Sequence, residues 1–275
     1  MRKPQLSIAI VATICAALLV FALVGCSSSS SESTDESEQT EQEEQAEDEE
    51  EEEEEEDTSS EDEDDATAVQ TDTSLALQGV AVGENGYIET PDETYTYGTW
   101  VATVTVTGYG SFDIELDADS APVSVSNFCH LASNGYYDGL AFYRVVEGFC
   151  LQGGTLGNSA SGSDDELSPI IGEFSDNGVD NELADNFERG VVAMARTSEA
   201  NSATTTFFIT LDSSDSVSQS LNGLYAAFGT IDEEGMSVVD AIVEATADKI
   251  DDSGMGIIED EDDMPIIESI TIEQL

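Results

Sequence analysis

From residue 101 to the C-terminus, the apolar residues of this chain come in short runs separated by glycine, serine, asparagine and aspartate. The first two runs alternate β-branched with polar residues on either side of Gly108-Tyr109-Gly110, a pattern typical of a β-hairpin. Only residues 123–134 and 237–247 have apolar side chains at helical spacing. Many short strands with two helices predict a mainly β fold, either a barrel or a sandwich. The runs of strand length are residues 101–107, 111–116, 141–146, 149–152, 190–195, 207–211, 225–229 and 266–272.

A polyacidic segment precedes this part of the chain. Residues 31–65 hold 23 of the 61 aspartates and glutamates, including an unbroken run of glutamates from 49 to 56. With almost nothing apolar to bury, the segment is expected to be disordered and extended by the repulsion of like charges. We expect a spacer and not a calcium site, because acidic runs without glycine-punctuated loop spacing bind calcium only loosely. Residues 66–97 are ambiguous, being mildly apolar at 75–82 and rich in turn residues at 83–98.

The N-terminus has the pattern of an export signal. Arg2 and Lys3 precede an uncharged apolar stretch, residues 6–25, which ends at Cys26. The sequence Leu-Val-Gly-Cys at 23–26 resembles a bacterial lipobox, which implies cleavage before Cys26 and lipidation of its thiol. An uncleaved membrane helix is the alternative, since twenty apolar residues can span a bilayer. Either interpretation puts the body of the protein at the extracytoplasmic face of the cell membrane.

These boundaries predict three parts: a lipoprotein signal peptide at 1–25, a disordered Ser-rich and acidic linker at 26–97, and a folded domain at 98–275. The folded part carries 33 carboxylates against four basic residues, a formal charge of −29. Such a surface repels the phosphates of nucleic acid and anionic lipid headgroups. We therefore expect no nucleic-acid partner and no membrane contact other than a lipid anchor.

Metal chemistry is not expected either. The chain has four cysteines without C-x-x-C spacing, and its one histidine, His130, has no second histidine to share a zinc ion. His130 falls on the predicted first helix, where we expect an exposed helix residue and not the base of a Ser-His-Asp hydrolase.

Four motifs in succession carry a family resemblance. The segment Phe-Tyr-Arg-Val-Val-Glu-Gly-Phe-Cys-Leu-Gln-Gly-Gly, residues 142–154, resembles the active-site strand pair of cyclophilins. Residues 121–139, 190–209 and 221–240 are similar to the family's first helix and two later signatures, in the family's order. The resemblance implies a closed eight-stranded antiparallel β-barrel capped by two α-helices. It also implies peptidyl-prolyl cis/trans isomerase activity without a cofactor, on proline-containing unfolded or exported polypeptides. We expect the protein to be a monomer.

The resemblance also assigns the site. An X-Pro bond isomerises through a twisted amide whose nitrogen regains its lone pair, and a fixed cation that donates hydrogen bonds stabilises that state. By resemblance Arg144 is this cation, Gln152 holds the substrate backbone, and Phe149 belongs to the same catalytic set. The expected proline slot and its rim consist of Cys150, Ala195, Arg196, Thr206, Phe208, Leu221 and Tyr225.

Four positions depart from the family pattern. Cys150 replaces a common methionine, Thr206 a usual glutamine, Ser220 a frequent aromatic residue and Tyr225 a frequent histidine. These changes leave open an alternative, a non-catalytic module that binds proline-containing segments. In a cyclophilin barrel Cys129 lies on the helix, too far from Cys150 for a disulfide, so two free thiols are expected.

Overall fold

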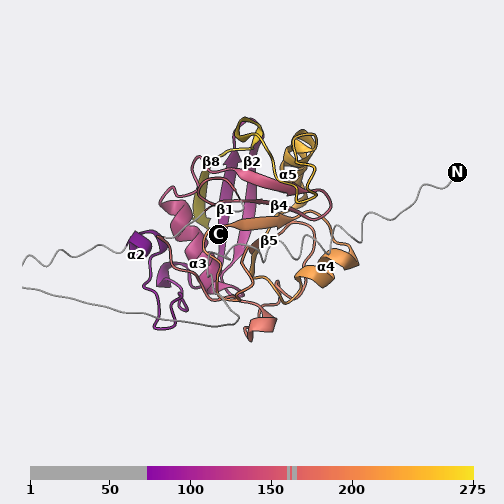
Figure 1. The fold of residues 1–275 in the computed structure, drawn as a ribbon. Coiled ribbons are helices and arrows are strands. Elements are labelled where there is room, and N and C mark those ends of the chain that lie inside the picture. The colour runs from indigo at the N-terminus through magenta and orange to yellow at the C-terminus, as the bar shows by residue number, and fades with distance from the viewer. Residues whose placement is uncertain (1–72, 160–161, 163–165) are drawn as a thin grey trace, which may run out of the picture. The chain divides into compact units, whose positions relative to one another are not determined.

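The computed structural model describes residues 73–159, 162 and 166–275. Eight strands form one sheet in the order β3-β4-β6-β5-β7-β2-β1-β8, and every neighbouring pair is antiparallel (Figure 1). The mainly β interpretation is therefore confirmed. The strands are β1 (Thr99–Val106), β2 (Gly110–Asp117), β3 (Phe142–Val146), β4 (Cys150–Gly153), β5 (Val191–Met194), β6 (Phe207–Thr210), β7 (Ala227–Thr230) and β8 (Ile267–Gln274).

The two helices expected from spacing are present as α3 (Pro122–Ser133) and α5 (Glu233–Thr246). α5 packs on β2, and α3 contacts β2, β7 and β8, so both helices bury apolar faces against the sheet. Two shorter helices that the sequence pattern did not predict are α2 (Thr73–Gln78) and α4 (Asp215–Leu221). Three 3₁₀ turns, η1 (Glu93–Tyr95), η2 (Ser175–Asn177) and η3 (Glu261–Asp263), lie in the connections.

The sheet is a curled half-barrel, and the expectation of a closed barrel is wrong. Its edge strands β3 and β8 meet only where both begin, through the pair Ala141 and Ile266 and neighbouring backbone hydrogen bonds. Beyond that point the outer edge of β3 pairs with the loop at 250–258, because Val145 N–H donates to Gly256 O (2.7 Å) and Ile258 N–H donates to Tyr143 O (3.0 Å). This loop occupies the edge that β8 would need for closure. In the described part of the chain no ladder joins the two edge strands.

The core follows the alternation in the first hairpin. Ala102, Val104 and Val106 of β1 are buried, while the residues between them are more exposed. The same alternation on β2 buries Phe112, Ile114 and Leu116. Phe128 on α3 continues this core, with its ring 5.1 Å from that of Phe228 and 5.5 Å from that of Phe207. An aromatic cluster thus fastens α3 to the sheet.

The N-terminus of α3 is capped from a distant loop. Ala121 at the N-cap has no side chain that could accept a hydrogen bond. The buried carboxylate of Glu173 accepts instead from the backbone N–H groups of Val123 (3.0 Å) and Ser124 (2.7 Å). Two of the donors that a helix start leaves without intrahelical partners are satisfied in this way.

The folded domain begins well before residue 98, so that predicted boundary needs correction. Residues 76–97, here called the strap, pack on the domain. Gln78 is fully buried and donates from Nε2 to Asn127 Oδ1 (2.9 Å) and to Ser168 O (2.8 Å). Ile88 is 1% exposed and pairs with Ile170 in a parallel bridge. The sequence did not indicate this because the contacts are long-range and the strap has little periodic structure of its own.

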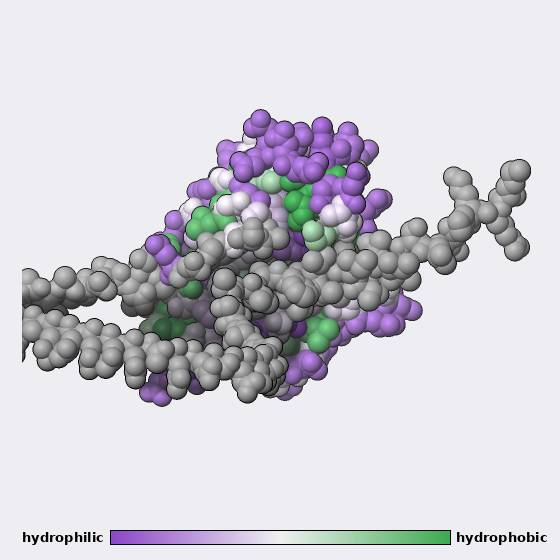
Figure 2. Space-filling model, viewed as in Figure 1, coloured by the Kyte–Doolittle hydropathy of each residue, from purple (hydrophilic) through white to green (hydrophobic). Residues whose placement is uncertain are grey.

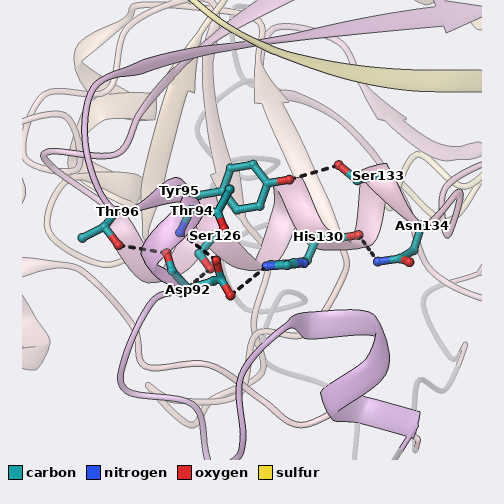
Figure 3. Close-up of polar contacts among 8 residues, drawn as sticks. All are labelled: Asp92, Thr94, Tyr95, Thr96, Ser126, His130, Ser133 and Asn134. Atoms are coloured by element: carbon teal, nitrogen blue, oxygen red, sulfur yellow. Dashed lines mark hydrogen bonds and ion pairs between the residues drawn. The ribbon is translucent and has the colours of Figure 1, made fainter.

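His130 faces the strap and is not the exposed helix residue expected. Its side chain is 20% exposed, and its Nε2 lies 3.5 Å from Asp92 Oδ2 (Figure 3). The Tyr95 ring meets the imidazole edge-on at 5.0 Å, and the close approach of Gly79, at φ +80°, leaves no room for a side chain there. Hydrogen bonds from Thr94, with His130 as a smaller cause, lower the pKa of Asp92.

One end of the domain is strongly acidic. Residues 232–263, which contain α5 and the loop to β8, hold thirteen carboxylates and a single lysine. Figure 2 shows hydrophilic residues covering the upper end of the visible face, where Figure 1 places α5.

The signal peptide, Cys26 and the acidic linker as far as residue 72 lie outside the described residues. Among the helices that are described, none has the length and apolar character needed to cross a membrane.

Candidate active site

The β3–β4 ladder brings Arg144 and Gln152 together. The two residues are directly opposite in register, so their side chains lie on the same face of the sheet. Arg144 Nη1 donates to Gln152 Oε1 at 2.8 Å, and Gln152 Nε2 donates to the Tyr143 hydroxyl at 2.7 Å. The Gln152 amide is therefore held at both ends. Tyr143 was missed in the sequence because it precedes the arginine as an ordinary strand residue.

Two further contacts fix the guanidinium of Arg144. Its Nε donates to the carbonyl oxygen of Met255 at 2.8 Å, and Nη1 lies 3.5 Å from Cys150 Sγ. The side chain is 5% exposed. Met255 acts through its backbone, so no sequence signal could have revealed it. A cation positioned in this way needs little reorganisation when charge develops beside it.

Three of the residues expected to form the proline slot and its rim, Cys150, Phe208 and Tyr225, lie next to this pair. Phe208 on β6 is opposite Gln152 on β4, and Cys150 also lies on β4. The Phe208 ring stacks on Phe187 with centroids 6.2 Å apart and meets Tyr225 edge-on at 5.5 Å. Phe187, which the sequence motifs did not single out, thus packs against Phe208, one of the expected slot residues. The whole set is buried: Phe149, Cys150, Phe208, Leu221 and Tyr225.

Three residues at the expected rim, Ala195, Thr206 and Ser220, are held by hydrogen bonds. Ala195 N–H donates to Thr206 O at 2.8 Å, so any backbone contribution from Ala195 must come from its carbonyl group. The hydroxyl of Thr206 shares a 2.6 Å hydrogen bond with that of Thr155. Ser220 lies at the end of α4, where its hydroxyl donates to Val217 O at 2.7 Å.

Arg196 and Tyr225 form the charged side of the rim. The guanidinium carbon lies 4.8 Å from the centre of the Tyr225 ring, a cation–π contact. Burial raises the pKa of Tyr225, and the nearby Arg196 opposes that rise. Tyr225 is therefore a neutral hydrogen-bonding group near physiological pH.

The two cysteines of the domain are free, as expected. Cys129 is buried on α3 and Cys150 on β4. Burial in apolar surroundings raises the pKa of Cys129 far above its ordinary value, so this thiol is unreactive.

The model of the family described as cyclophilin type peptidyl-prolyl cis-trans isomerase/CLD matches residues 101–271. The chain belongs to the cyclophilin family. Peptidyl-prolyl cis-trans isomerase A of Dickeya dadantii is 36% identical over 145 residues, which cover 52% of this chain and 72% of that protein. Peptidyl-prolyl cis-trans isomerase cyp18 of Streptomyces antibioticus is 40% identical over 140 residues, covering 50% of this chain and 79% of that protein.

A solved structure agrees on the fold. A cyclophilin type peptidyl-prolyl cis-trans isomerase of Cryptosporidium parvum superposes with a TM-score of 0.53 at 24% identity, covering 64% of this chain and 99% of that one. As a cyclophilin, the chain is a peptidyl-prolyl cis-trans isomerase that binds proline-containing peptides.

Proposed function

We propose that Arg144 is the catalytic group of this isomerase. Rotation about an X-Pro bond crosses a barrier of about 18–20 kcal/mol because it breaks amide resonance. In the twisted state the prolyl nitrogen regains its lone pair and can accept a hydrogen bond. The observation that supports Arg144 is its fixed geometry, with Nη1 bound to Gln152 and Nε bound to the Met255 carbonyl. An arginine stays charged at any physiological pH and needs no proton transfer to act.

The neighbouring residues have supporting roles in this proposal. Gln152 binds the substrate backbone from the position that its bonds to Arg144 and Tyr143 define. Phe149, Cys150, Phe208 and Leu221 receive the proline ring in an apolar slot. Tyr225 and Thr206 lie on the rim, and Ala195 and Arg196 contact the substrate residues that precede the proline. Binding the ring alone lowers the KM, whereas the Arg144 contact is made only in the twisted state and raises the kcat.

We also propose that the enzyme works at the extracytoplasmic face of the cell membrane, anchored through lipid on Cys26. The lipobox-like sequence and the export-signal pattern support this location. The acidic segment would act as a spacer that lets a monomeric domain reach exported chains emerging nearby. The formal charge of −29 on residues 98–275 opposes close association of two copies.

The test is an isomerisation assay on the full chain, with the Arg144→Ala and Arg144→Lys variants. We expect Arg144→Ala to lower kcat/KM on a neutral X-Pro peptide by at least about tenfold, or about 1.4 kcal/mol. Arg144→Lys should recover only part of the loss, since lysine lacks the planar fork. Arg189→Ala is the matched control, because the Arg189 side chain forms an ion pair with Asp240 and donates to the Leu211 carbonyl. Near-normal activity of a folded Arg144→Ala variant would show that another group is the catalyst.

A further inference from the structure

Arg196 follows β5 at the border of the proposed proline slot. Its guanidinium lies over the Tyr225 ring, and Tyr225 in turn meets the slot residue Phe208 at 5.5 Å. Only one ring therefore separates this second arginine from the slot.

The side chain of Arg196 is held in one position. Its guanidinium carbon lies between two rings, 5.1 Å from the centre of Phe174 and 4.8 Å from that of Tyr225. Nε donates to Leu224 O at 2.7 Å, and Nη1 donates to Thr197 O at 2.9 Å. Among the described residues, none accepts a hydrogen bond from Nη2. A guanidinium held by rings and carbonyl groups has lost its rotational freedom before any ligand arrives, so binding to it costs less entropy.

The charge of Arg196 is also uncompensated. Two of the other cations of the domain are neutralised locally: Arg189 bonds Asp240 at 2.7 Å, and Lys249 lies 3.6 Å from Asp263. Arg196 makes no ion pair with any carboxylate in the part of the chain that the structure describes, although carboxylates outnumber cations 33 to four in residues 98–275. All its observed partners are carbonyl oxygens or aromatic rings, which leave its full positive charge in place.

We infer that Arg196 is a specificity-determining residue that favours substrates with a carboxylate side chain two residues before the proline. The inference rests on the proposed placement of the substrate, in which the residues before the proline pass Ala195 and Arg196. A guanidinium with a remaining N–H group binds a carboxylate by a charge-assisted hydrogen bond, and a lysine at the same place in the substrate would be repelled. A rim pair of this kind changes affinity by up to about 1 kcal/mol, or about fivefold.

A purely structural role for Arg196 predicts a different result. If the side chain only braces Tyr225 and the Leu224 carbonyl, its removal lowers activity on all peptides by the same factor. The ratio of activities on acidic and basic peptides separates the two roles, because a general loss cancels in the ratio.

The experiment measures kcat/KM of the full chain on three blocked peptides, Ala-Glu-Ala-Pro-Phe, Ala-Gln-Ala-Pro-Phe and Ala-Lys-Ala-Pro-Phe. Alanine stays next to the proline because that neighbour alters the intrinsic cis population. The wild type should prefer the Glu peptide to the Lys peptide by about three- to fivefold at low salt. Salt should weaken the preference by screening. Arg196→Gln should abolish it, Arg196→Lys should retain part of it, and Arg189→Gln should leave it unchanged.

The outcomes are distinct. A wild type without a Glu preference overturns the inference, whatever the variants do. An Arg196→Gln variant that keeps the preference also overturns it. If Arg196→Gln does not fold, the salt dependence of the wild-type ratio and the Arg196→Lys ratio decide. If the wild type accelerates none of the peptides, the proposed catalytic function fails instead, and peptide affinities from fluorescence anisotropy then test the charge preference alone.

Discussion

Gln78 in the strap donates a 2.9 Å hydrogen bond to Asn127 on α3, and Asn127 donates from Nδ2 to the carbonyl of Thr204 at 2.7 Å. Thr204 lies two residues before Thr206 on the rim of the proposed slot. The side chains of Gln78 and Asn127 thereby connect the strap to the segment that carries Thr206. A segment upstream of the family match at 101–271 thus supports the site.

The first prediction concerns this connection. Gln78→Ala should lower the free energy of unfolding by about 1–3 kcal/mol, because it removes the buried hydrogen bonds that Gln78 makes with the Asn127 amide and the backbone of Ser168. Urea unfolding of the full chain measures the change. Asn85→Ala is the control, since Asn85 is an exposed strap residue whose side chain donates to Glu89 Oε1. Equal stability of the two variants would contradict the role assigned to Gln78.

The second prediction concerns the pH dependence of Glu173. Burial raises the pKa of this carboxyl above its ordinary value of 4.5, although hydrogen bonds from Ser124 and Val123 oppose the rise. The folded protein then holds the proton more tightly than the unfolded chain does. The resulting stability is fully present below the unfolded-state pKa and is lost as the pH rises through the folded-state pKa.

Glu173→Gln removes this titration. The free energy of unfolding of the wild type minus that of the variant should therefore fall as the pH rises above the ordinary pKa of 4.5. Denaturant titrations at several pH values measure it, and Glu188→Gln, at an exposed position, controls for the change in formal charge. A difference that rises with pH would mean that the hydrogen bonds outweigh burial.

The third prediction concerns the orientation of Gln152. Tyr143→Phe removes the acceptor of the 2.7 Å bond from Gln152 Nε2, so the amide can turn away from the position that Arg144 defines. We expect kcat/KM to fall by about three- to tenfold, which corresponds to the loss of one hydrogen bond of about 1 kcal/mol. Tyr109→Phe, in the turn between β1 and β2, serves as the control for loss of a hydroxyl. An unchanged kcat/KM in Tyr143→Phe would show that Gln152 keeps its orientation without this bond.

The fourth prediction concerns the anchor. Mass spectrometry of the membrane-extracted protein should find residues 1–25 removed and Cys26 carrying at least two acyl chains, because a single chain binds membranes only marginally. Cys26→Ser should release the protein from the membrane fraction or leave the signal uncleaved. An unmodified Cys26 in a chain that still starts at Met1 or Arg2 would favour the membrane-helix alternative.

The sequence predicted the secondary-structure elements that are determined by residues close together in the chain. Alternation in residues 101–116 indicated the first hairpin, and apolar spacing indicated α3 to within a residue or two at each end. The motif at 142–154 placed Arg144 and Gln152 on a strand pair, where the structure also has them. In each case neighbouring residues determine the pattern.

Features that depend on distant contacts could not be predicted. The strap is ordered by Gln78 and Ile88, whose partners lie far along the chain. The half-barrel stays open because a loop, and not β8, pairs with most of β3, a competition between two segments that no local pattern reveals. Met255 reaches Arg144 through a backbone carbonyl, which every residue type possesses.

That loop, residues 250–258, has a consequence for an enzyme that handles unfolded chains. An unpaired strand edge is a template on which an extended polypeptide can add itself as a further strand. β3 carries Arg144, so an open edge there would let clients attach by backbone hydrogen bonds beside the catalytic group, whatever their sequence. By pairing with Val145 and Tyr143, the loop closes this edge. The loop therefore leaves the proposed proline slot, and not the backbone of β3, as the place where a client meets Arg144.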